Sequence, residues 1–162
     1  MNQPRTVVAN YTTWGLTWGT NTYTAQYSDP MQLQATLTAD GSPVSGKVIS
    51  FSVGTDTGSG TTNASGVAAT GNTAVLTQAP GNYTAGASCP VVQCGVLLTI
   101  TYNPYVITKE DARATYTGSL FVSTASTTSG NFTATLAATI QDITAVTGDP
   151  DYDAYGGDIR NA

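Results

Sequence analysis

The sequence predicts an all-β protein, and three observations support that prediction. Charged residues make up 9% of the chain, against roughly a quarter in ordinary soluble domains. The polar positions are filled mainly by Thr, Ser, Gly, Ala and Asn, so the chain is poor in helix formers and rich in residues that suit a pleated surface. Segments of strand-like sequence recur about every 8 to 12 residues with turn residues between them, a spacing typical of a β-sandwich.

The first predicted elements are an N-terminal arm, residues 1–22, and one clear strand. Residues 6–23 mix aromatic residues with Thr and Gly without helical spacing, so we expect an entry strand and a loop. Residues 31–39 place Met31, Leu33, Ala35 and Leu37 on one face, and this period of two indicates a half-buried strand. Asp-Gly-Ser-Pro at 40–43 is a turn, and the alternating segment 47–53, with Phe51 in the core, is expected to complete a hairpin.

The rest of the predicted domain is made of shorter segments. Residues 54–66 are rich in Gly, Ser and Thr and are expected to form a short strand pair joined by polar loops. Further strands are predicted at 73–77, 82–88 and 96–102, with a turn at 79–81. This strand set ends near Thr108, so the first domain is assigned to residues 23–108.

Five motifs in this domain share their order and spacing with one known family. They are Tyr27-Ser-Asp-Pro30, Gly41-Ser-Pro-Val-Ser-Gly46, Val48-Ile-Ser-Phe-Ser-Val53, Asn63-Ala-Ser-Gly-Val-Ala68 and Ala79-Pro-Gly-Asn-Tyr-Thr84. Over about residues 25 to 108 the chain resembles the bacterial Ig-like repeat domains of extracellular surface and adhesin-type proteins. The resemblance implies an immunoglobulin-like β-sandwich on the cell surface or secreted. The chain departs from the family pattern at Cys89–Cys94, where the family has a different loop.

Residues 109–162 are interpreted as a second, incomplete Ig-like unit. Residues 107–118 look like the junction between two repeats, and residues 131–140 place Phe132, Ala134, Leu136, Ala138 and Ile140 on one face. The unit has about half the strands that a sandwich needs, so its apolar face would lack a partner. Either the chain is a mature or cloned piece of a longer array, or strands from another chain complete the unit, with residues 6–22 as a candidate donor.

The two cysteines, Cys89 and Cys94, enclose a four-residue loop. We expect a disulfide, which would imply an oxidising compartment. Two free thiols are one alternative and a redox or metal pair is the other, although two sulfurs without histidine cannot complete a tetrahedral zinc site.

Charge and composition exclude several classes of function. The net charge of −5 and the pI near 4.1 argue against nucleic-acid binding, because phosphate contacts need clustered Lys and Arg. The sequence has no apolar run long enough to span a membrane, and its start lacks the layout of a signal peptide. Without histidine the commonest general base is missing, so we expect no enzyme.

Two groups of residues are candidate binding sites. Asp149, Asp151, Asp153 and Asp158 could offer carboxylates to calcium from one loop, the alternative being a solvated acidic loop; no other cofactor is predicted. Trp14 and Trp18 would share one face of an extended strand and could contact sugars. The alternative for both tryptophans is a place at the edge of the core.

These observations favour a structural stalk or fibre module of a bacterial extracellular surface protein. Its partners would be neighbouring Ig-like repeats or identical subunits, with assembly into filaments by strand complementation. The alternative is an adhesive module that binds glycans or proteins.

Overall fold

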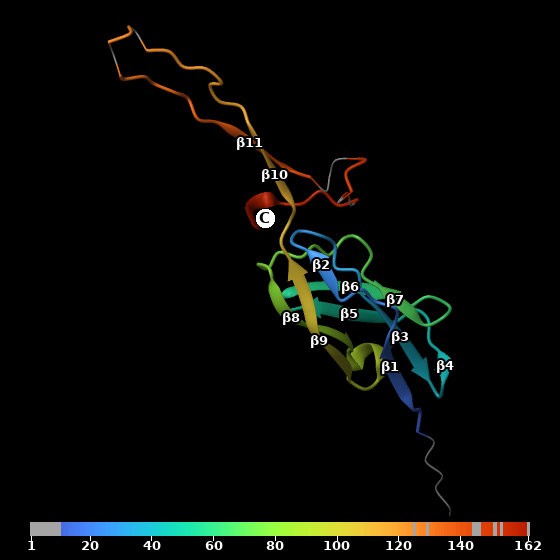
Figure 1. Cartoon of the computed structure of the whole chain (residues 1–162). Coiled ribbons are helices and arrows are strands. Elements are labelled where there is room, and N and C mark those ends of the chain that lie inside the picture. The colour runs from blue at the N-terminus through green and yellow to red at the C-terminus, as the bar shows by residue number, and fades with distance from the viewer. Residues whose placement is uncertain are drawn as a thin grey trace, which may run out of the picture.

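The computed structural model describes residues 11–124, 126–128, 130–143, 147–150, 152 and 154–161. Strands dominate these residues, and the described helices are two single turns, which confirms the all-β prediction (Figure 1). In chain order the elements are β1 Trp14–Trp18, β2 Thr24–Gln26, β3 Gln34–Ala39, β4 Ser42–Pro43, β5 Val48–Val53, β6 Asp56–Thr61, β7 Val67–Ala69, β8 Gly81–Cys89, α1 Val91–Cys94, β9 Leu98–Thr108, β10 Ala112–Tyr116, β11 Ala138–Asp142 and the 3-10 turn η1 Ile159–Asn161.

Strand β3 is the centre of the first sheet. On one side it pairs antiparallel with β1, from Trp14 opposite Ala39 to Trp18 opposite Ala35. On its other side it pairs with β4 and β7. The alternation predicted for this strand is present, because Ala35 and Leu37 are fully buried, Gln34 is exposed and Thr36 is half-buried.

The second sheet has five strands in the order β2-β9-β8-β5-β6. Its neighbours are antiparallel except β2 and β9, which run parallel. Strand β6 has the sequence Asp-Thr-Gly-Ser-Gly-Thr, which has little strand propensity, yet all six residues pair with β5. A Cβ on Gly60 would lie 2.1 Å from the carbonyl oxygen of Ala69 in β7, so β6 needs glycine to approach the first sheet this closely.

Both sheets contribute to one hydrophobic core. Its buried members are Leu16, Met31, Leu33, Ala35, Leu37, Ile49, Phe51, Val53, Ala68, Leu76, Ala85, Ala87, Cys89, Cys94, Tyr105 and Ile107. The first sheet supplies residues from β1, β3 and β7, and the second sheet supplies residues from β5, β8 and β9. The core therefore draws on residues from Leu16 to Ile107, and burial of this apolar surface is the main source of stability.

The predicted pairing of residues 31–39 with residues 47–53 is wrong, because β3 and β5 lie in different sheets. Asp40 and Gly41 both have positive φ, at 50° and 77°, which is the geometry of a tight two-residue hairpin turn. The chain therefore returns immediately as the short strand β4, and β5 begins only after a crossing to the second sheet.

Two other predicted segments differ from the structure in length. Residues 73–77 form no strand: Val75 makes a single bridge to Pro30, although Leu76 next to it is fully buried. The strand predicted at 96–102 continues much further, as β9.

The residues assigned to an N-terminal arm include a strand of the core. Residues 14–18 form β1, which completes the first sheet, and Leu16 at its centre is buried. The reason is the alternation of Trp14, Leu16 and Trp18, which turns three apolar side chains toward the core. The core thus begins before residue 23. Residues 14–18 pair with β3 of the same domain. Residues 1–10 lie outside the described part of the chain.

The cysteines form the predicted disulfide, and the single-turn helix α1 lies inside the loop that it closes. Both cysteine side chains are buried in the core.

Beyond β9 the chain forms a long hairpin that extends away from the core (Figure 1). Strands β10 and β11 pair antiparallel at its base, as a sheet of two strands. We call residues 112–142 the hairpin arm, of which residues 125 and 129 are not described. In the described part of the chain, no helix has the length and apolar character needed to cross a membrane.

Candidate functional site

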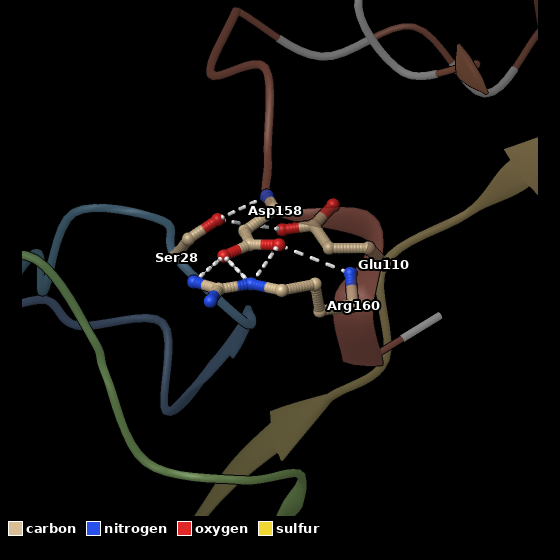
Figure 2. Close-up of polar contacts among 4 residues, drawn as sticks. All are labelled: Ser28, Glu110, Asp158 and Arg160. Atoms are coloured by element: carbon tan, nitrogen blue, oxygen red, sulfur yellow. Dashed lines mark hydrogen bonds and ion pairs between the residues drawn. The ribbon is translucent and has the colours of Figure 1, made fainter. Parts of the chain in front are cut away.

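The C-terminal residues 154–161 return to the core at the point where β9 leads into β10. Figure 2 shows the polar contacts made there, among Ser28, Glu110, Asp158 and Arg160. The backbone N–H of Asp158 donates to Ser28 Oγ at 2.7 Å, across 130 positions of sequence. A second tie is formed by Gln32, whose Nε2 donates to the hydroxyl of Tyr155 at 3.1 Å. We call this contact region the junction.

Glu110 lies at the centre of the junction and is 2% exposed. Its Oε1 accepts a hydrogen bond from Ser28 Oγ at 3.3 Å. The backbone of Gly157 lies directly against the same carboxyl group, since a Cβ at residue 157 would be 2.0 Å from Glu110 Oε1. The position therefore requires glycine, and the requirement comes from close approach rather than from a turn.

Ser28 joins the core to the returning segment. Its φ of 68° is unusual for a residue with a side chain, and its backbone N–H donates to the carbonyl oxygen of Leu76 at 3.0 Å. This conformation places the hydroxyl between the amide of Asp158 and the carboxyl of Glu110, where it accepts from one and donates to the other.

The described carboxylates in and beside the C-terminal loop have partners within the chain. Arg160 donates from Nε to both carboxylate oxygens of Asp158, at 2.8 Å and 2.6 Å. These hydrogen bonds hold the pKa of Asp158 below its usual range. Asp149 accepts from the guanidinium of Arg113 at 2.6 Å, and Asp142 accepts from the backbone N–H of Gly157 at 2.5 Å.

Of the four aspartates proposed as calcium ligands, two are described by the structure, and these two do not share a partner. Asp149 and Asp158 bind different arginines, while Asp151 and Asp153 lie outside the described residues. Among the residues that are described, no group of three or more His, Cys, Asp or Glu side chains is arranged to hold a metal ion. The calcium site stays a prediction, and a rise in melting temperature with added calcium would support it.

The two tryptophans lie at the edge of the core. Trp14 and Trp18 are partly buried and pack against the core cluster, in the position that the structural alternative predicts. Trp18 meets Tyr23 edge to face, with ring centroids 6.0 Å apart, and Tyr23 stacks on Tyr102 at 3.5 Å. Contact with sugars through Trp14 and Trp18 stays a prediction.

Sequence reasoning missed the residues that build the junction. Ser28, Glu110 and Arg160 are far apart in sequence, and nothing in their local patterns indicates that they meet. The available signals were the turn-forming Ser28-Asp-Pro30 and the pair Gly156 and Gly157, which mark places where the backbone approaches something closely.

Comparison of the chain with protein-family models, with curated proteins and with solved structures found no match.

Proposed function

We propose that this chain is a structural module of an extracellular surface protein, built as an immunoglobulin-like sandwich that is linked end to end with further β-units. The observation that carries the proposal is that the first strand and the hairpin arm lie at opposite ends of the core. Strand β1 begins at one end of the core, and β9 leads into the hairpin arm at the opposite end (Figure 1). Tandem modules that hold something at a distance have this layout.

The junction supports the same role. A stalk needs a fixed angle between one unit and the next, and hydrogen bonds from residues far apart in sequence restrain the segment where β9 leads into β10. The buried carboxyl group of Glu110 adds to this restraint, because losing the hydrogen bond from Ser28 while the carboxyl group stays buried would leave its desolvation uncompensated.

The disulfide supports the extracellular part of the proposal. A disulfide persists in oxidising compartments and is rare in the cytosol of mesophiles. The closed loop is short, and both cysteines are buried in the core. The pair is thus suited to a lasting structural role rather than to redox exchange.

A binding survey tests the structural role against the adhesive alternative. The full chain is immobilised and probed with a glycan array and with extracellular matrix proteins. A structural module should bind none of them selectively. Selective binding that is lost in Trp14→Ala or Trp18→Ala would overturn the proposal in favour of an adhesive module. Selective binding that survives both changes would also overturn it, and would place the adhesive surface elsewhere.

A further inference from the structure

The hairpin arm has one apolar face. In the recorded register Ala114 lies opposite Ile140, and Tyr116 lies opposite Ala138. Hydrogen bonds from Thr117 N to Ala137 O and from Ser119 N to Thr135 O continue this register toward the tip. Side chains alternate between the two faces of a strand. Continuing this alternation from β10 and β11 along the rest of the hairpin assigns the even-numbered positions to one face, which we call the arm face: Ala114, Tyr116, Gly118, Leu120, Val122, Phe132, Ala134, Leu136, Ala138 and Ile140.

The large side chains of the arm face are exposed. The exposed fractions are 47% for Tyr116, 79% for Leu120, 46% for Val122, 59% for Phe132, 83% for Leu136 and 56% for Ile140. The opposite face carries mainly Thr and Ser, together with Arg113, Gln141 and the exposed Phe121. A two-stranded hairpin with one apolar and one polar face needs a cover on the apolar side.

The arm face is also self-complementary in shape. Each cross-strand row from Ala114 to Leu120 pairs one large residue with one small residue, and the large residue alternates between the strands. A two-fold axis along the hairpin would set Ile140 over Ala114 of a second copy, and Tyr116 over Ala138. The face is hollowed beside this position, where Tyr116, Leu136, Ala137 and Ala138 line a shallow groove.

Charge and area both allow a second copy to be the cover. The arm face has no charged residue between positions 114 and 140, so two such faces meet without repulsion. Its six large side chains expose roughly 700 Å² per copy, and two copies would bury roughly 1,400 Å², within the range of about 1,200 to 2,000 Å² for stable interfaces.

We propose that the arm face is a homodimer interface, on which the arm face of a second copy of this chain packs. The inference rests on the proposed function, in which the module joins a neighbouring unit. It adds that the arm makes this contact and that the neighbour is a second copy of the chain. The two tests are separable, because the oligomeric state is measured without any ligand.

Sedimentation velocity on the full chain, from about 1 µM to about 100 µM, tests the proposal, since interfaces of this size reach micromolar affinity or better. The parent should change from monomer to dimer within this concentration range, or should already be a dimer at its lower end. Leu136→Ser should weaken the dimer by about 10-fold or more, because it places a hydroxyl at the centre of the interface. Leu136 is 83% exposed, so the core should melt unchanged in this variant.

Phe121→Ser is the matched control. Phe121 is 93% exposed in the same arm but occupies an odd-numbered position, on the opposite face by alternation. It should leave dimerisation unchanged. A parent that stays monomeric at 100 µM would overturn the proposal. An equal loss of dimer in both variants would also overturn it, because it would indicate nonspecific association through exposed apolar residues. A dimer that Leu136→Ser leaves intact would overturn it as well.

Discussion

Phe51 shows how a single residue holds the two sheets together. It lies in the middle of β5, is 1% exposed, and belongs to the core shared by both sheets. Replacing it with alanine should lower the free energy of unfolding by about 3 to 5 kcal/mol, because the cavity cannot be filled by strands held in two ladders. Urea denaturation measures the change. Val48→Ala in the same strand is the control, since Val48 is 37% exposed and should cost far less.

Asp56 carries the pH dependence of one loop. Its carboxylate accepts hydrogen bonds from Thr77 N at 2.8 Å and from Thr77 Oγ1 at 2.6 Å. Burial raises the pKa of Asp56, but the hydrogen bonds from Thr77 and Gln78 outweigh it, so the pKa lies below the usual value. A lowered folded-state pKa means that the carboxylate stabilises the fold above the unfolded-state pKa, and that this contribution is lost as the pH falls through the folded-state pKa.

The variant Asp56→Asn tests this assignment. It should be less stable than the parent by about 1 kcal/mol at neutral pH. The difference should shrink as the pH falls below about 4, because protonation removes the same charge from the parent. Urea denaturation at several pH values gives the comparison. A difference that stays constant with pH would show that the charge of Asp56 has no part in stabilising the loop.

Among the elements, the returning segment depends on one glycine. Gly157→Ala would place a Cβ against the buried carboxyl group of Glu110, which has little room to move. Residues 154–161 should then release from the junction, and their backbone amides should exchange faster with solvent in hydrogen-exchange mass spectrometry.

The melting temperature of the core should stay the same in this variant, since the core cluster contains no residue of that segment. Gly130→Ala is the matched control: Gly130 has no heavy atom within 4 Å of its Cβ position, and no positive φ. Unchanged exchange in Gly157→Ala would mean that the segment is held by other contacts.

The elements also show what the sequence can predict. Strand β3 was predictable because its alternation is local: Ala35 and Leu37, together with Leu33 just before the strand, need one buried face wherever the strand lies. Residues 54–66 were expected to hold a short strand pair, but the bounds of β6 could not be predicted, because Gly58 and Gly60 have no side chains to alternate and their role depends on contact with the first sheet. The pairing partners of β3 could not be predicted from its own sequence either. They depend on the turn at Asp40 and Gly41 and on the crossing of the chain to the second sheet before β5.

The junction shows the same limit at the site. A turn or a disulfide joins residues close in sequence, and both were visible in the sequence. Ser28 and Asp158 meet across 130 positions. Such a contact depends on how the whole chain is folded, which local patterns do not record.

At the scale of the molecule, the core should be independent of the hairpin arm. Every member of the core cluster lies between Leu16 and Ile107. A fragment ending at Thr108 should therefore melt cooperatively, within a few degrees of the parent, as measured by circular dichroism. A fragment ending at Leu97 removes β9 and is the control that should not fold. Loss of the cooperative melt in the longer fragment would show that the core and the arm fold as one unit.

The parallel pairing of β2 with β9 has a mechanical consequence. Val106 N donates to the carbonyl oxygen of Tyr23 at 2.9 Å, and Tyr27 N donates to that of Thr108 at 3.0 Å. If force acts at the start of β2 and at the end of β9, the two parallel strands slide along each other. The hydrogen bonds between them then share the load together instead of opening one by one. The core resists stretching along the same direction in which the arm leads away from it.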